Sequence, residues 1–141
     1  MKPTRQRLSV KIEVPQGGRV KRLPDGSIDF VSPLACPFAY GSVLDTLAAD
    51  GDPEDALVIG EAPKAGEVVE RQVWGRVRFV DGGVEDSKWV VGIAPPSEAD
   101  WRSLDAFFRR YAWAKRLLYV VRMRSPDVRF LGVERTLHSA G

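Results

Sequence analysis

Apolar and polar side chains alternate along residues 8–14, which is the period-two pattern of a strand with one buried face. The Pro-Gln-Gly-Gly run at 15–18 ends this strand, and Leu-Pro-Asp-Gly-Ser at 23–27 predicts a turn between two further strands. Residues 56–59, Ala-Leu-Val-Ile, form a short and wholly apolar run that is typical of a buried strand. The first half of the chain is therefore predicted to consist of short strands joined by tight turns.

The second half begins with a predicted hairpin. Apolar-rich segments at 68–80 and 88–93 flank the sequence Asp-Gly-Gly at 81–83, whose glycines tolerate the positive φ angles of a tight turn. Asp86 and Lys88 are two positions apart at the start of the second strand, so we expect their side chains to share one face of it.

A helix is predicted to begin near Ser97, because Ser97 is a good N-cap residue and Asp100 follows in the first turn. Apolar residues then recur at spacings of three and four, at Trp101, Leu104, Phe107, Phe108, Tyr111, Ala114 and Leu118. The end of the helix stays open up to residue 124, because Tyr-Val-Val at 119–121 also suits a strand. Residues 128–134 predict a final strand.

These elements predict an α+β fold in which one main helix packs against a small antiparallel β-barrel, OB-like, of five or more strands. No repeat or linker interrupts the pattern, so one domain is expected over residues 1–141. The single cysteine, Cys36, is expected to be a small buried hydrophobic residue. Because no disulfide, signal-peptide pattern or membrane-spanning run is found, we expect a cytoplasmic location and no membrane partner.

Charge is unevenly distributed, although the formal net charge is only +2. Residues 1–22 carry seven Lys or Arg and one acid, Glu13, whereas residues 45–55 carry five acids and no base. The balance turns basic again over 102–135. If the fold gathers these segments around one cleft, the cleft suits an anion carried with a divalent metal ion, such as a phosphate compound. Charges solvated on separate faces are the alternative interpretation.

The run Asp-Gly-Asp-Pro-Glu-Asp at 50–55 holds four acids in six positions. Carboxylates this close repel one another and raise each other's pKa values, so a folded chain keeps them ionised only when a cation compensates. Carboxylate oxygens are ligands that Mg2+, Mn2+ and Ca2+ prefer. With two more aspartates beside the predicted hairpin, a site for several divalent ions could form from Asp50, Asp52, Asp55, Asp81 and Asp86.

Four motifs follow one another along the chain. They are Glu-x-Pro at 13–15 followed by Lys21, Asp-x-Asp-Pro-x-Asp at 50–55, the acidic segment 81–88, and Phe-Phe-x-x-Tyr at 107–111. In order and spacing, residues 8 to 111 resemble the soluble family I inorganic pyrophosphatases. That family usually has an apolar residue where Glu54 stands.

The resemblance implies a hydrolase that cleaves inorganic pyrophosphate to two phosphates, depends on Mg2+ (with Mn2+ or another divalent ion as alternatives) and assembles as a homo-oligomer. Asp52 would accept the proton of the attacking water. The metal ligands would be Asp50, Asp55, Asp81 and Asp86, with Glu13 supporting a metal through water. Phosphate oxygens would be held by Lys21, Tyr40, Lys88 and Tyr111.

Two departures from the family pattern affect the phosphate side of this site. The expected arginine has no match within residues 28–32, and Ala112 stands where a lysine usually follows the helical tyrosine. The loss of such a donor removes transition-state stabilisation unless another cation replaces it. Four basic residues could do so: Arg19, Arg22, Arg110 and Lys115. A divergent or weakly active homologue that acts on another diphosphate is therefore the second hypothesis.

Other interpretations of the same residues stay open. Asp86 with Lys88 could be only an ion pair, Lys21 could be a solvated surface residue, and the hydroxyls of Tyr40 and Tyr111 could belong to core aromatics. A third hypothesis is a non-catalytic barrel that binds nucleic acid through its basic flanks and aromatic residues. The acidic middle would repel a phosphate backbone, so nucleic acid is not the expected partner.

Overall fold

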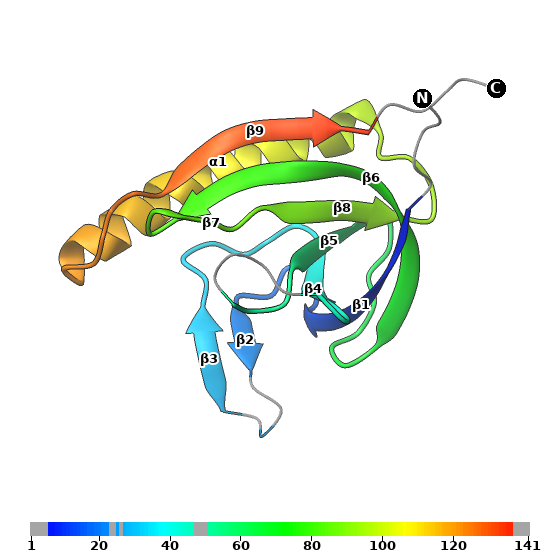
Figure 1. Cartoon of the computed structure of the whole chain (residues 1–141), viewed down its shortest axis with the longest axis horizontal. Coiled ribbons are helices and arrows are strands. Elements are labelled where there is room, and N and C mark those ends of the chain that lie inside the picture. Colours follow the sequence, from blue (N-terminus) through cyan, green and yellow to red (C-terminus); the bar gives the residue numbers. More distant parts are fainter. Residues whose placement is uncertain (1–5, 23–24, 26, 47–50, 137–141) are drawn as a thin grey trace.

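The structure is a computed structural model, and it describes residues 6–22, 25, 27–46 and 51–136. Within these ranges the chain forms nine strands and one helix (Figure 1). In chain order they are β1 (Arg7–Val14), β2 (Val20–Arg22), β3 (Ile28–Val31), β4 (Ala39–Val43), β5 (Asp55–Ile59), β6 (Val68–Asp81), β7 (Val84–Glu85), β8 (Lys88–Gly92), α1 (Glu98–Val121) and β9 (Arg129–Arg135).

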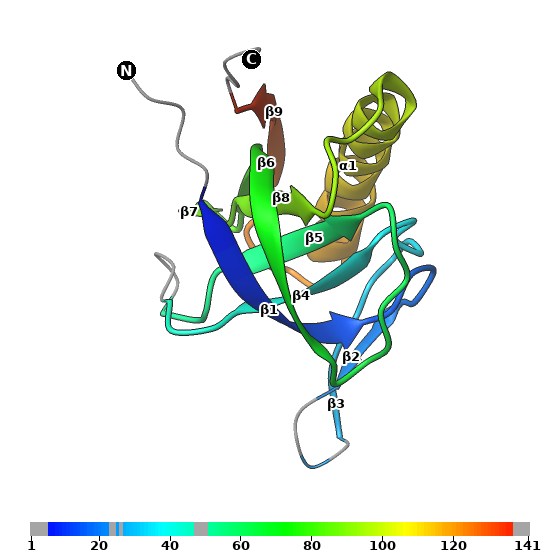
Figure 2. The ribbon, with the colours of Figure 1, turned by 90° about the vertical axis from the view of Figure 1, so that its right-hand side faces the viewer.

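Five strands close into a ring in the order β1, β4, β5, β8 and β6, because the long strand β6 pairs with β8 and also returns to β1 (Figure 2). Strands β7 and β9 also pair with β6 and extend the sheet beyond the ring. Strands β2 and β3 form a separate hairpin that projects away from the ring (Figure 1). The closed ring with one packed helix confirms the predicted α+β, OB-like fold.

One strand pair of the ring differs from the antiparallel pattern expected. Strands β5 and β8 run parallel, whereas the remaining neighbours in the ring are antiparallel. The reason is connectivity: β5 and β8 are separated in the chain by the whole of β6, and not by a tight turn that would reverse direction. As a result, the first residues of β5 and β8 lie at the same edge of the ring.

Alternating side chains divide the apolar core into two clusters. One cluster draws on all five ring strands and fills the ring with small aliphatic side chains: Val10, Ile12, Ala39, Val43, Ala56, Val58, Val69, Val73 and Val91. The other lies between the ring and α1 and contains most of the buried aromatic rings: Phe38, Trp74, Phe79, Trp101, Phe107, Phe108 and Tyr111. Strand β5 contributes to both clusters, which explains why residues 56–59 are wholly apolar.

Helix α1 begins with the capping box predicted at Ser97. The Ser97 hydroxyl accepts a hydrogen bond from the Asp100 amide at 3.0 Å, and the Asp100 carboxylate accepts one from the Ser97 amide at 3.0 Å. The helix continues to Val121, so residues 119–121 are helical and do not start a strand. In the part of the chain described, no helix has both the length and the apolar content needed to cross a bilayer.

Candidate active site

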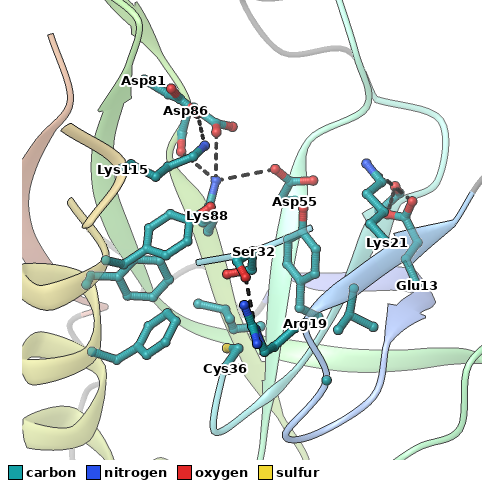
Figure 3. A pocket seen from close by; sticks show the side chains of 18 of the residues that line it. Glu13, Arg19, Lys21, Ser32, Cys36, Asp55, Asp81, Asp86, Lys88 and Lys115 are labelled. Atoms are coloured by element: carbon teal, nitrogen blue, oxygen red, sulfur yellow. Dashed lines mark hydrogen bonds and ion pairs between the residues drawn. The ribbon is translucent and has the colours of Figure 1, made fainter. Parts of the chain in front are cut away.

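A cavity of about 660 Å3 opens between the strand ring, α1 and the segment that carries β2 (Figure 3). Its walls bring together the predicted acidic residues that the structure describes: Glu13, Asp52, Asp55, Asp81 and Asp86. The four predicted phosphate-binding residues line the same cavity: Lys21, Tyr40, Lys88 and Tyr111. Asp50 lies outside the described residues. Residues more than 90 positions apart in sequence thus share one pocket.

Strand register explains how three of the polar side chains meet. Ser42 in β4 pairs with Asp55, the first residue of β5, and Asp55 pairs with Lys88, the first residue of β8. The parallel pairing of β5 and β8 places both first residues at one edge of the ring. Side chains of paired residues on neighbouring strands stand on the same face of the sheet, so this register directs the three toward the cavity.

The Lys88 ammonium connects two of the aspartates. Its Nζ lies 3.0 Å from Asp86 Oδ2 and 3.4 Å from Asp55 Oδ2, and it donates a further hydrogen bond to the Asp86 carbonyl oxygen at 2.9 Å. Only 5% of Lys88 is exposed to solvent. Burial acts to lower the pKa of Lys88, but Asp86 and Asp55 raise it above its ordinary value, so the side chain is a cation. The predicted ion pair of Asp86 and Lys88 is present, within a larger group of charges.

In this arrangement the pKa of the Asp55 carboxyl is raised. Burial raises the pKa of Asp55 to about 6, since the opposing effect of Lys88 is partly offset by the neighbouring Asp86 carboxylate. Burial also raises the pKa of the Tyr40 phenol well above its usual value, and the charge of Asp55 adds to the shift. For Tyr111, burial is again the main cause and raises the pKa to about 12. Both phenols are therefore protonated hydrogen-bond donors near neutral pH.

Helix α1 supplies a second buried cation. Lys115, of which 5% is exposed, forms an ion pair with Asp81 Oδ2, and the Tyr119 hydroxyl donates a hydrogen bond to Asp81 Oδ1 at 2.7 Å. Lys115 Nζ also lies 5.3 Å from the ring centre of Tyr111. Asp81 ends β6, so this cluster joins the last residue of a ring strand to the helix (Figure 3).

On the opposite wall, Glu13 projects from β1 into the cavity. Its carboxylate accepts a hydrogen bond from the Ser42 hydroxyl and forms an ion pair with Lys21 Nζ at 3.4 Å. About a fifth of each charged side chain is exposed, 18% for Glu13 and 24% for Lys21. Lys21 is thus partly buried in the pocket and is not a freely solvated surface residue.

The oxygen donors in this cavity fit hard divalent cations in kind. Asp55 and Asp86 already share one cation, the Lys88 ammonium, which shows that a positive charge is accommodated between them. Among the residues that the structure describes, no three carboxylate, histidine or cysteine side chains stand close enough together to hold a metal ion. The carboxylates are instead paired with lysines, and Asp52 is exposed at the wall of the cavity.

Several residues at this site were not assigned a role from sequence. Tyr119 lies in a stretch whose residue types also suit a strand. It follows Lys115 by four residues and Tyr111 by eight, which is helical spacing. Of the four basic residues considered as substitutes, Arg19 and Lys115 line the cavity, whereas Arg110 lies on a separate groove. The Arg22 side chain is outside what the structure describes.

Ala112 supplies no cation at the position where the family resemblance leads us to expect a lysine. Only 1% of this residue is exposed, and it belongs to the aromatic core between α1 and the ring. A lysine at residue 112 would have to place its stem in that packed core. The buried lysine of this helix is found one turn later, at Lys115.

Comparison with known proteins agrees with this geometry. A sequence profile described as "Inorganic pyrophosphatase" matches residues 9–116. The inorganic pyrophosphatase of Halalkalibacterium halodurans is 41% identical over 95 residues, which cover 62% of this chain and 56% of that protein. Across the first curated relatives the match spans 51 to 62% of their length.

Solved structures give the same result over most of the fold. An inorganic pyrophosphatase from Coxiella burnetii aligns with a TM-score of 0.72 at 25% identity, covering 95% of this chain and 89% of that one. The enzyme from Thermus thermophilus aligns with a TM-score of 0.71 at 29% identity, covering 92% of this chain and 83% of that one. The profile covers well over half of the residues, and the chain belongs to the inorganic pyrophosphatase family.

Proposed function

We propose that this chain hydrolyses inorganic pyrophosphate to two phosphates and uses Mg2+ as its cofactor. The observation that carries the proposal is a single cavity in which aspartates alternate with buried cations, Lys88 and Lys115. Carboxylates attract divalent ions and lysines attract phosphate, so one cavity serves a metal-bound diphosphate. The relatives that match the chain carry the name inorganic pyrophosphatase, which supports the same substrate.

The proposed metal ligands are the predicted ones: Asp50, Asp55, Asp81 and Asp86, with Glu13 acting through water. When bound, divalent ions would lower the pKa of nearby water and offset negative charge on the phosphates. Asp52 is proposed to accept a proton from the attacking water, a role that its exposed carboxylate on the cavity wall allows. Mn2+ or another divalent ion with oxygen preference is an alternative to Mg2+.

The phosphate side of the proposed reaction uses donors that do not change protonation near neutral pH. Tyr40 and Tyr111 remain protonated because burial raises their pKa values, so each can donate a hydrogen bond to a phosphate oxygen. Lys21 and Lys88 are proposed to pair with phosphate oxygens as negative charge develops on the leaving group. Arg19, on the same cavity, adds a guanidinium near this region.

A divergent homologue that acts on another diphosphate is the second candidate. The observation in its favour is Ala112, which is buried in the core where the family places a phosphate-binding lysine. A phosphate-release assay with purified protein separates the two. We expect rapid release from pyrophosphate that requires Mg2+, and slow release from nucleoside diphosphates and triphosphates. Preference for a nucleotide would favour the second candidate, and no release from any of them would contradict both.

Self-association is also proposed. Four apolar side chains on the last turns of α1 are largely exposed in the single chain: Trp113, Leu117, Val120 and Val121. Burying them against another copy would remove apolar surface from water, which favours a homo-oligomer. Light scattering after size exclusion should give a mass above the 15.6 kDa of one chain. A monomeric mass at micromolar concentration would contradict this proposal.

Three sequence predictions remain proposals: one pyrophosphatase-like domain over residues 1–141, a cytoplasmic location, and no nucleic-acid partner. The acidic cavity supports the last of these, because carboxylates such as those of Asp55 and Asp86 repel a phosphate backbone unless cations intervene. Retention on heparin that falls steeply with salt, without any hydrolysis, would favour the nucleic-acid alternative.

A further inference from the structure

Helix α1 carries a row of polar side chains that faces the cavity. Tyr111, Lys115 and Tyr119 are spaced by four residues, so they lie one above another on the same face of the helix. All three line the cavity that contains the aspartates. The Lys115 ammonium lies 5.3 Å from the Tyr111 ring centre and 5.4 Å from the Tyr119 ring centre, which places it between two aromatic faces.

Both oxygens of the Asp81 carboxylate are engaged by this row. Lys115 pairs with Oδ2 and the Tyr119 hydroxyl donates to Oδ1. Within the described residues, Asp81 is a cavity carboxylate whose charge is balanced from the helix, whereas Asp55 and Asp86 are balanced by Lys88 from within the sheet. A divalent ion that binds Asp81 must therefore displace the Lys115 ammonium or bind beside it against charge repulsion.

An ammonium displaced from Asp81 stays in the cavity. The Lys115 side chain is 6% exposed, and its backbone is fixed within a helix that packs on the ring through Phe108 and Tyr111. The flexible four-carbon stem lets the ammonium rotate while the helix stays in place. The nearby groups that line the cavity include Tyr111 and Lys88, both proposed to contact phosphate. The displaced cation would face the substrate anion rather than bulk water.

We propose that Lys115 is an exchanging cation: it neutralises Asp81 when no divalent ion is bound, and it contacts a phosphate oxygen of the substrate when a divalent ion takes its place on Asp81. This inference rests on the proposed function. It keeps a cation in the cavity in both states, and it supplies one on the helix that has Ala112 where the family resemblance leads us to expect a lysine. Metal ion and diphosphate then bind with positive coupling, since each favours the same position of Lys115.

The test compares Lys115→Met with Arg116→Met. Methionine keeps about the length and the apolar packing of the lysine stem and removes the ammonium group, with its charge and its hydrogen-bond donors. Arg116 is the next residue of the same helix, is exposed and does not line the cavity, so its replacement by methionine matches the loss of one positive charge. Circular dichroism checks that each variant is folded, and Lys115→Gln provides a second neutral variant if methionine prevents folding.

Two affinities are measured for each protein. The first is Mn2+ binding without any anion, followed by the electron paramagnetic resonance signal of free Mn2+. We expect Lys115→Met to bind Mn2+ at least about threefold more tightly, because a competing cation has been removed. The second is calorimetric binding of imidodiphosphate, a non-hydrolysable diphosphate, at saturating Mn2+. We expect this affinity to fall about tenfold or more, as for the loss of a charge-assisted hydrogen bond.

Opposite changes in the two affinities, with Arg116→Met close to the original protein in both, support the exchange. A change in only one affinity, weaker Mn2+ binding, or Lys115 variants that match Arg116→Met would overturn it. If the original protein binds both Mn2+ and imidodiphosphate but the Lys115 variants behave like Arg116→Met, only this inference is contradicted. If the original protein binds neither Mn2+ nor imidodiphosphate, the proposed function is contradicted as well.

Discussion

Replacing Lys88 with methionine tests whether the two central aspartates depend on a cation. The ammonium of Lys88 is 3.0 Å from Asp86 Oδ2 and 3.4 Å from Asp55 Oδ2, and the Lys88 side chain is 6% exposed. Methionine keeps the apolar stem near the Phe79 ring, which Lys88 Nζ approaches to 5.7 Å. The substitution therefore leaves Asp55 and Asp86 facing each other without the charge that separates them.

The size of the effect follows from burial. At an effective dielectric constant of about 20, each contact is worth about 5 kcal/mol of Coulomb energy before desolvation. Desolvation of the three charges offsets most of that gain, but breaking a buried pair from one side typically costs about 3–5 kcal/mol. Because 23% of the Asp86 side chain is exposed in an open cavity, solvent screens part of this loss. We expect Lys88→Met to lower the free energy of unfolding by about 2–4 kcal/mol.

Urea unfolding at pH 8, followed by tryptophan fluorescence, measures this loss. Lys64→Met is the matched control, since Lys64 is exposed and its replacement should change stability by no more than about 0.5 kcal/mol. Adding Asp55→Asn to Lys88→Met should restore at least about 1 kcal/mol, because the uncompensated charge is removed. A loss below about 1 kcal/mol for Lys88→Met would refute the reasoning. So would a double variant whose loss of unfolding free energy exceeds the sum of the losses of the two single variants.

Three further predictions address the fold and Cys36. Gly41→Ala should cost about 1–3 kcal/mol in thermal unfolding, because a β-carbon at residue 41 would lie 2.0 Å from the Lys11 carbonyl oxygen; an unchanged melting temperature would contradict the close strand approach. Ser97→Ala should cost about 1 kcal/mol by the same method, since the capping box with Asp100 is lost, and no change would show that the cap contributes nothing. Burial raises the pKa of Cys36 to about 11, so iodoacetamide at pH 8 should alkylate the native protein far more slowly than the protein in urea; equal rates by mass spectrometry would contradict it.

The sequence predicted those elements whose pattern reflects burial directly. The alternation of β1 and the apolar run of β5 were correct, because β1 buries one face and β5 buries both. The N-cap of α1 was correct because capping depends on local sequence. Strand β4 was not predicted, since Ala39 and Gly41 have low strand propensity. It forms because both of its edges pair, with β1 on one side and β5 on the other.

The candidate site was predictable to the extent that its residues lie in contiguous motifs. Asp52 and Asp55 are in one run, so spacing identified them, and both line the cavity. The contacts from α1 depend on how the helix is rotated against the ring, which sequence does not specify. Lys115 was therefore one of four basic candidates, and Tyr119 was obscured by β-branched neighbours although tertiary contacts keep it helical.

The most direct measurement of the central claim is the initial rate of phosphate release from pyrophosphate, with Mg2+, by the original protein, Asp52→Asn and Glu54→Gln. Glu54 is two residues from Asp52 and accepts a hydrogen bond from Trp89 Nε1 at 3.2 Å, and it does not line the cavity. We predict that the original protein and Glu54→Gln release phosphate at similar rates, while Asp52→Asn is slower by about 100-fold or more. Absence of hydrolysis by the original protein, or near-normal turnover by Asp52→Asn, would contradict the claim.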